Sequence, residues 1–419
     1  MLETPVGRDV IDMAEVASIP SEVRHDVDLL FVVDDTRDMA GVQARLIDTW
    51  RRIRGHLAFA DGGFPTVHLA VVSSDLGVGA AQVPGCTATG DDGRLVTGAG
   101  GAPWLTVTLD DPAAADAAFA GLARLGEAGC AFEQPLAAMR RALDGTQPAN
   151  DGFLRPEAAL GVVFVAGDDD CSIDDPAFFA DGDAPLGKFR CFREGVHCDD
   201  DAVPEGPQSG CAPRASSAVM ADVDDEAGFL RALKADPAAV TVTTLAGEPD
   251  RVALARTGDG LEVSPACTDA VNDVTPRPGI RLGAFAGRMR GSVAGLCEQT
   301  LEEAGTPAGL DLRRALGHRC LEGRILDVKP WEPGVQFQCE VEAVSAGGEV
   351  TALAACPNPN HVFDEDGPCW AIKPGPAQCG DFPSQLALQV NWGGDDKLTT
   401  PPGVTTRVRC AVEDDDPLD

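Results

Sequence analysis

The first two thirds of the chain contain several unbroken apolar runs, each of which ends at polar residues. Five apolar residues, Leu29 to Val33, are followed at once by Asp34. A short, partly β-branched run of this kind predicts a strand that is buried on both faces, as in the middle of a parallel sheet. We therefore predict strands at 27–34, 67–73, 160–166 and 240–245, with an edge strand at 105–109.

Helical spacing occurs between these runs. The segment 39–57 carries apolar side chains at intervals of three and four, with arginines on the opposite side. Prolines in a first turn, where they are tolerated, mark two further helices at 111–125 and 134–143. Helices are also predicted at 224–234 and 290–304. Strands and helices that alternate in this way indicate an α/β fold with a doubly wound, mostly parallel sheet.

The last hundred residues follow a different pattern. Short β-like runs alternate with Gly- and Pro-rich turns, and six of the 14 cysteines fall here. The runs are 336–343, 350–354, 386–391 and 405–412. We predict an irregular lead-in at 1–25, an α/β domain at 26–310 with a cysteine-rich insertion at 171–222, and a small disulfide-bonded β domain or extension at 318–419.

Cysteine usage indicates an oxidising compartment. The 14 cysteines are even in number and lie mostly in Gly-, Pro- and Asp-rich loops, which is typical of disulfides formed outside a reducing cytosol. Disulfides also suit the cysteines of the insertion better than zinc, because their spacing is not that of a zinc knuckle. Spacing alone does not fix the connectivity. The pairings that we propose are Cys86–Cys130, Cys171–Cys191, Cys198–Cys211, Cys267–Cys297 and Cys369–Cys379.

The start of the sequence carries no recognisable export signal. Met1 is followed by Leu-Glu-Thr-Pro, without a basic start or an apolar stretch. We infer that an export or lipoprotein signal, and in the second case a lipid anchor, precedes this sequence in the precursor. No apolar run approaches the length of a membrane span. The predicted location is extracytoplasmic: secreted, periplasmic, or on the cell surface as a lipoprotein.

The charge balance narrows the range of partners. The chain has 67 acidic and 33 basic residues and a net charge of −34. A field of this sign repels phosphate backbones and anionic lipid, which argues against nucleic-acid binding. It attracts divalent cations and basic partners.

Oxygen side chains gather directly after the first strand. Asp34, Thr36 and Asp38 alternate in the sequence, so they can converge at the carboxyl edge of the sheet, where open α/β sheets bind ligands. Such oxygen clusters suit Mg²⁺, Ca²⁺ or Mn²⁺. The alternative is that these residues only cap the helix that follows, since Asp and Thr are common caps. Ser73–Asp75, after the second strand, is a candidate to line the same edge.

The motif Asp34-x-Thr36-x-Asp38-Met39 after a buried strand resembles the Asp-x-Ser-x-Ser metal-ion-dependent adhesion site of von Willebrand factor A (VWA) domains. The similarity continues through 68–77, 129–143 and 162–172, which look like the secreted, cysteine-bearing A-domain proteins of myxobacteria. It covers roughly residues 25–250. In that family a second loop supplies a threonine and a third loop an aspartate, and the ion keeps an open position for a carboxylate of the partner.

The resemblance implies a set of metal ligands that departs from the family pattern. Asp38 stands where serine is usual, Glu133 stands where threonine is usual, and the third-loop aspartate falls at or beside Gly167. Several carboxylates favour Ca²⁺ over Mg²⁺ and weaken the ion's hold on an acidic partner residue. The implied ligands are Asp34, Thr36, Asp38, Glu133 and Asp168.

No catalytic signature accompanies these residues. The six histidines are scattered, and the sequence has no His-Glu-x-x-His, Gly-x-Ser-x-Gly or Walker motif. We expect a non-enzymatic extracytoplasmic binding or adhesion protein for a protein or glycan ligand, with a VWA-type divalent-cation site that is partly degenerate. The alternative is a structural or assembly protein of the cell envelope with a non-functional metal site, which would self-associate through the insertion or the tail.

Overall fold

The chain forms two compact units, each described here by itself. One consists of 24–58 and 64–315 and is called the α/β unit; the other consists of 1–23, 59–63 and 316–419 and is called the β unit. The computed structural model describes residues 13–21, 23–60, 63–108, 110–179, 189–200, 204–258, 260–268, 274–297, 300–332, 336–345, 347–364, 366–375, 379–380, 382–394 and 397–413.

The α/β unit contains a six-stranded sheet in the order β12-β9-β5-β2-β3-β4. Every neighbouring pair is parallel except β3 and β4, which are antiparallel. Its strands are β2 (Asp26–Val33), β3 (Thr66–Ser73), β4 (Leu105–Val107), β5 (Ala159–Val165), β9 (Val240–Ala246) and β12 (Ser292–Gly295). All residues of β5 are buried, as are residues 27–33 of β2. A mixed α/β fold with a largely parallel, buried sheet is thus confirmed.

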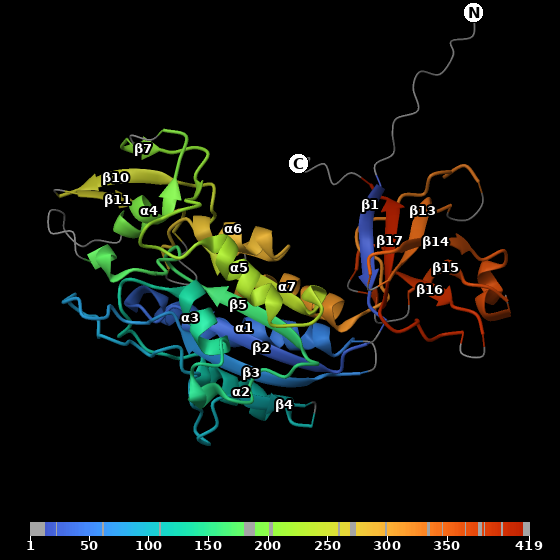
Figure 1. Cartoon of the computed structure of the whole chain (residues 1–419), viewed down its shortest axis with the longest axis horizontal. Coiled ribbons are helices and arrows are strands. Elements are labelled where there is room, and N and C mark those ends of the chain that lie inside the picture. The colour runs from blue at the N-terminus through green and yellow to red at the C-terminus, as the bar shows by residue number, and fades with distance from the viewer. Residues whose placement is uncertain are drawn as a thin grey trace, which may run out of the picture. The chain divides into compact units, whose positions relative to one another are not determined.

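Helices cover both faces of this sheet (Figure 1). On one face, Leu30 and Val32 pack with side chains of α3 (Pro135–Leu143), α5 (Val223–Ala232) and α6 (Ile280–Arg288). The opposite face carries α1 (Ala40–Leu57), α2 (Pro112–Leu122) and α7 (Leu301–Leu316). There the Phe119 ring lies 4.9 Å from Phe31 and 6.0 Å from Trp50. Successive residues of β2 therefore bury opposite sides in two separate apolar layers.

Short elements follow β5 in the cysteine-rich insertion and beyond it. They are α4 (Phe189–Gly195), β6 (Val196–His197), β7 (Gly206–Pro207), β8 (Ala212–Pro213), β10 (Ala253–Thr257) and β11 (Gly260–Val263). β6 pairs with β8, and β10 pairs with both β7 and β11. Residues 180–188 and 201–203 of the predicted insertion lie outside the described residues. Elements this short need covalent support, which the disulfides provide.

The β unit holds a second six-stranded sheet, in the order β1-β17-β13-β14-β15-β16. Only β14 and β15 are parallel neighbours. The strands are β1 (Met13–Ile19), β13 (Cys339–Ser345), β14 (Val350–Ala355), β15 (Cys369–Pro374), β16 (Leu386–Asn391) and β17 (Val404–Ala411). The predicted disulfide-rich β region in the tail is confirmed. Residues 13–19, predicted as part of an irregular lead-in, instead form a strand paired with β17.

The two outer strands of this sheet are bridged by residues 319–322. The amide of Leu388 donates to Arg319 O, and that of Leu321 donates to Leu386 O, which covers β16. The next amide, of Glu322, donates to Val16 O on β1. Part of the backbone N–H and C=O groups at both edges therefore form hydrogen bonds within the chain, which limits pairing with another molecule.

All 14 cysteines form disulfides. Four of the five predicted pairings are present: Cys86–Cys130, Cys171–Cys191, Cys198–Cys211 and Cys267–Cys297. The predicted Cys369–Cys379 bond is wrong, because Cys369 bonds to Cys356 and Cys379 bonds to Cys320, while Cys339 bonds to Cys410. The pairing of β14 with β15, which brings residue 354 opposite Cys369, is what places Cys356 within reach.

The predicted helix at 290–304 is also wrong. Residues 292–295 form β12, the edge strand beside β9, and α7 begins only at Leu301. Gly291 allows the chain to approach β9 closely, since a Cβ there would overlap Val242 O. A local apolar pattern of four residues does not distinguish a short parallel strand from a helix turn.

Candidate functional site

Asp34 is the first residue beyond β2 and lies at the carboxyl edge of the sheet. Its side chain is 1% exposed. One carboxylate oxygen accepts hydrogen bonds from Thr36 N (2.8 Å) and Thr36 Oγ1 (2.7 Å), and the other accepts one from Gly167 N (3.0 Å). Burial raises the pKa of Asp34, although the Thr36 and Gly167 donors oppose that rise. Both oxygens are therefore engaged by donors of the chain itself.

Thr36 lies beside Asp34, whereas Asp38 does not join them. Thr36 is half-buried and precedes a short 3-10 turn, Arg37–Met39, but its hydroxyl donates to Asp34 and makes no cap hydrogen bond. Asp38 is an exposed residue of that turn. Alternation in sequence would place three side chains on one side of an extended strand, but the chain turns after Thr36.

The loop after β5 presents Gly167, not Asp168, to Asp34. A Cβ at Gly167 would lie 3.3 Å from Asp34 Oδ2 and 2.9 Å from Met39 Sδ, so this close approach needs a glycine. Asp168 instead forms an ion pair with Arg277 at 2.6 Å. Glu133 is 2% exposed, and its carboxylate is close enough to Arg277 to contribute to the raised pKa of that residue.

These residues do not fit a divalent cation as they stand. Within the described ranges, no three carboxylate, imidazole or thiol groups come together in a way that could hold a metal ion. An ion at Asp34 would compete with the amides of Thr36 and Gly167, which carry the wrong sign of partial charge for a cation, whereas the Thr36 hydroxyl oxygen could itself ligate one. An arginine already compensates the charge of Asp168.

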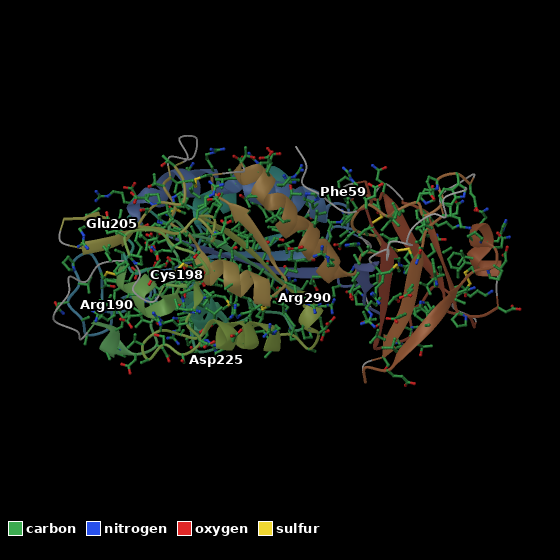
Figure 2. The ribbon with its side chains drawn as sticks, turned by 90° about the horizontal axis from the view of Figure 1, so that it is seen from above. Phe59, Arg190, Cys198, Glu205, Asp225 and Arg290 are labelled. Carbon is green, nitrogen blue, oxygen red and sulfur yellow. A yellow bond between two sulfur atoms is a disulfide. The ribbon has the colours of Figure 1, made fainter. Side chains whose placement is uncertain are left out.

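Loops that are cross-linked by disulfides surround the carboxyl edge of the sheet. We call residues 74–103, 126–134, 167–179, 189–200 and 204–222 the loop canopy. Cys86–Cys130 joins its first two segments, and Cys171–Cys191 joins the third to the fourth. Val78, Phe132, Phe178 and Met220 share one apolar cluster beneath them. In Figure 2, Arg190, Cys198 and Glu205 of the canopy lie together at one end of the α/β unit.

Two aspartates anchor the canopy to the sheet. Asp170 is 1% exposed and accepts hydrogen bonds from Leu136 N, Ser172 Oγ and Arg281 Nε. Asp169 accepts from the amides of Arg281 and Leu282 at the start of α6. The acidic run after β5 therefore connects the end of this strand to α3 and α6 through hydrogen bonds.

A second group of carboxylates lies next to Asp34, and one of its members, Asp75, belongs to the segment Ser73–Asp75 that the sequence offered as a candidate to line this edge. Asp35 is 7% exposed, and among the described residues its Oδ1 has no hydrogen-bond partner. Burial, together with the nearby carboxylates of Asp75, Asp34 and Asp91, raises the pKa of Asp35 to about 7. Asp75 accepts hydrogen bonds from Gly77 N and Cys130 N. The sequence signals for this group were the adjacency of Asp34 and Asp35 and the position of Asp75 directly after the second predicted strand.

Asp35 makes the stability of the α/β unit depend on pH. A folded-state pKa near 7 lies above that of an unfolded aspartate, near 3.8, so the folded state binds the extra proton and stability falls as pH rises from about 4 to 7. Because an amide at this position cannot ionise, we expect Asp35→Asn to raise stability more at pH 8 than at pH 5, by on the order of 2–3 kcal/mol. Urea unfolding at both pH values measures this, with Asp38→Asn, an exposed neighbour, as the control. An equal effect of Asp35→Asn at pH 5 and pH 8 would contradict it.

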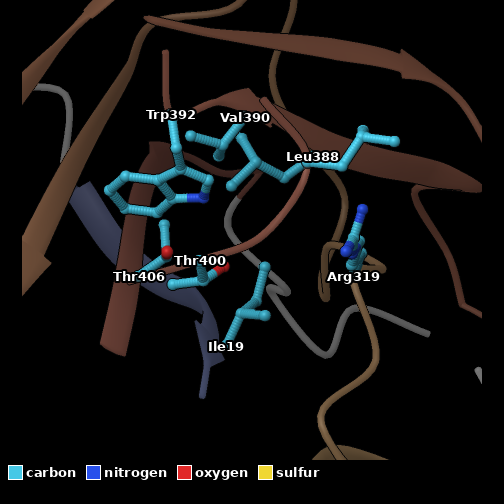
Figure 3. A pocket seen from close by; sticks show the side chains of 8 residues that line it. Ile19, Arg319, Leu388, Val390, Trp392, Thr400 and Thr406 are labelled. Carbon is cyan, nitrogen blue, oxygen red and sulfur yellow. The ribbon is translucent and has the colours of Figure 1, made fainter. Parts of the chain in front are cut away.

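The β unit contains a shallow pocket beside Trp392 (Figure 3). Its apolar lining consists of Ile19, Leu388, Val390, Trp392 and Leu398, and Arg319, Thr400 and Thr406 add polar groups. Its volume of about 20 Å³ is far below the roughly 300–1,000 Å³ of pockets that enclose a small-molecule ligand. This pocket has room for little more than a water molecule.

Comparisons with known proteins give no family. No family model and no curated protein matches the chain. Two similar solved structures are the pilus adhesin SpaC from Lactobacillus rhamnosus GG in its open conformation (10% identity, TM-score 0.30, 96% of this chain and 41% of that chain covered) and the human COPII-coat protein Sec24c (12% identity, TM-score 0.28, 96% and 40% covered). The chain spans about two fifths of the length of each. Likeness at these TM-scores carries no argument about this chain.

Two observations bear on location. The seven disulfides indicate an oxidising, extracytoplasmic environment. In the part of the chain that the structure describes, no helix combines the length and the apolar character that crossing a bilayer requires.

Proposed function

We propose that the chain is a non-enzymatic, extracytoplasmic binding protein of the adhesion type that recognises a protein or glycan through the loop canopy, without a divalent cation. We also propose that the α/β unit is a doubly wound domain of the VWA type. The parallel order β9-β5-β2-β3, the helices on both faces and the placement of Asp34 and Thr36 after β2 support that assignment.

The observation that carries this proposal is that both oxygens of the Asp34 carboxylate already accept hydrogen bonds from the chain. All three of its hydrogen bonds come from Thr36 and Gly167, and the side chain is buried. In this proposal, contact with a partner does not depend on a metal ion at Asp34. The canopy above is cross-linked, and loops that are already ordered lose little conformational entropy on binding.

The charge of the canopy indicates the kind of partner. Its exposed carboxylates, among the described residues, belong to Asp91, Glu127, Asp174, Asp175, Asp199, Asp200 and Glu205. A protein surface of this sign accelerates encounter with basic groups and disfavours anionic ones. The preferred ligand is therefore a basic protein segment or an amine-bearing glycan.

Arrays of basic peptides and amine-bearing glycans, probed with the labelled full chain, test the proposal. We expect binding in Ca²⁺ to persist in EDTA and to fall at least tenfold when four canopy acids, Asp174, Asp175, Asp199 and Asp200, are changed to Asn. The matched control changes four exposed acids of the β unit to amides: Glu332, Glu340, Glu349 and Asp364. Binding that requires Ca²⁺ and is lost in Asp34→Asn would overturn it.

The second candidate, an assembly protein of the cell envelope, has one observation in its favour. The β unit exposes several large apolar side chains, at Trp331 (76%), Leu398 (51%), Val350 (48%) and Phe363 (37%). Light scattering over a range of concentrations, with and without EDTA, distinguishes the two. Growth in mass that EDTA does not affect and that Trp331→Ser reduces would favour assembly over ligand binding.

A further inference from the structure

Three aspartates, Asp35, Asp75 and Asp91, lie together at the carboxyl edge of the sheet. Asp35 and Asp75 come two residues after the parallel strands β2 and β3, whose last residues are paired with each other. Consecutive amides of one loop donate to both of them: Gly129 N to Asp35 O (3.1 Å) and Cys130 N to Asp75 Oδ2 (3.2 Å). Asp91 joins them through its amide, which donates to Asp75 O (2.8 Å).

This group of acids has donors but no cation of its own. Asp75 accepts hydrogen bonds from two amides, and Asp91 accepts one from the Ser73 hydroxyl. Asp35 Oδ1 is buried and has no hydrogen-bond partner among the described residues. Within the same part of the chain, no Arg, Lys or His forms an ion pair with any of the three carboxylates.

Other buried aspartates of the α/β unit do have a basic partner. Arg155 and Lys234 both reach the carboxylate of Asp28, at 2.8 Å and 3.3 Å, and Arg281 reaches that of Asp170. A buried carboxylate is strongly unfavourable unless an opposite charge or hydrogen bonds compensate it. The three aspartates therefore form an anionic position that a cation from outside the chain would complete.

Residues 126–129, which we call the cover segment, lie over Asp35. Residues 126–128 are exposed, and Gly126 has a φ of 100°. A Cβ at Gly129 would lie 2.2 Å from Asp35 Oδ1, so the segment rests directly on the unpartnered oxygen. At its other end Gln43 Nε2 donates to Gly126 O (3.0 Å), and Gly126 N donates to Gln43 Oε1 (3.1 Å). An exposed segment held by a few hydrogen bonds can open locally while the sheet stays folded.

We propose that Asp35, Asp75 and Asp91 form a subsite for the ammonium group of a lysine in the bound protein segment, and that the cover segment moves aside as the lysine enters. The subsite deepens the proposed function and rests on it. Asp91 is exposed and lies at the entrance, whereas Asp35 supplies the unpartnered oxygen inside. An ammonium group has three rotatable donors and can bridge separate carboxylates, whereas a guanidinium favours both oxygens of one carboxylate. The subsite therefore selects lysine over arginine.

Calorimetric titration of the full chain with two peptides of equal charge, octalysine and octa-arginine, tests this. We expect wild type to bind octalysine about tenfold more tightly and Asp35→Asn to bind the two peptides equally. Asp38→Asn removes an exposed acid three residues further on and should keep the preference. Asp91→Asn should lose part of it, and this variant at an exposed position decides the test if Asp35→Asn is recovered unfolded. Gln43→Met, which releases Gly126, should bind octalysine several-fold more tightly than wild type does, because the cover segment then opens more easily.

The subsite is overturned if wild type does not prefer octalysine, or if the preference survives in Asp35→Asn and Asp91→Asn. An octalysine affinity that Gln43→Met leaves unchanged would overturn the role of the cover segment. Failure of the subsite and failure of the proposed function give different results. If both peptides bind wild type equally and the four-acid canopy variant loses both, the canopy stands without the subsite. If that variant keeps a preference for octalysine that depends on Asp35, the subsite stands and the canopy does not.

Discussion

Replacing Arg281 with Met is expected to lower the free energy of unfolding of the α/β unit by about 3–5 kcal/mol. Arg281 is fully buried, and its Nε donates to Asp170 Oδ2 at 3.0 Å. Its Nη2 also donates to Ala221 O at 2.6 Å. Methionine fills much of the same volume but leaves the buried Asp170 without its charged partner, with only the Leu136 amide and the Ser172 hydroxyl as donors, and this is the main part of the expected loss.

Urea unfolding of Arg281→Met measures this loss. The double variant with Asp170→Asn should recover part of the stability, because it removes the stranded charge. Arg256→Met, at an exposed arginine, serves as the control and should change stability by less than about 0.5 kcal/mol. A double variant no more stable than Arg281→Met would show that the ion pair is not the cause.

Removing the Cys86–Cys130 disulfide, as the double Ser variant, is expected to lower the free energy of unfolding by about 4 kcal/mol. The bond spans 44 residues, and the chain-entropy relation for a loop of that length gives this magnitude. The loss has a local part too, because Gly129 N donates to Asp35 O and Cys130 N donates to Asp75. Freeing residues 129–130 loosens the canopy over the acidic group.

Denaturant unfolding and limited proteolysis together test this expectation. Cleavage should appear first within residues 74–103, before the sheet unfolds. The Cys198–Cys211 bond spans only 13 residues, so its removal should cost less, about 3 kcal/mol. An equal or larger loss from the shorter bond would argue against the entropic account for this canopy.

The central strand and its layers could be predicted because their signals are local. Leu29–Val33 is apolar without a break, and a strand with parallel neighbours on both sides needs that composition. The positions of Asp34 and Thr36 at the sheet edge could be predicted because both residues come directly after that strand. The position of Asp38 could not be predicted, because the turn at 37–39 depends on where the chain packs after Thr36.

The residues that decide the chemistry of the edge had no such signal. Arg277 pairs with Asp168 across 109 positions of sequence, and its segment matches no motif. The strand β1 pairs with β17 at Met13 and Ala411, and nothing near residue 13 indicates that partner. The assignment of Asp168 as a metal ligand came from the resemblance to VWA domains, and the fold places Gly167, one residue earlier, against Asp34.

The pairing of the first strand with the last constrains the biogenesis of the protein. β17 lies between β1 and β13 in the sheet and carries Cys410, which bonds to Cys339. Residues 13–19 therefore lack this partner strand until residues 404–411 have been synthesised. Such long-range closure is slow, so a chain cut short before residue 404 would leave β1, β13 and Cys339 without their partners and become a target for quality-control proteases.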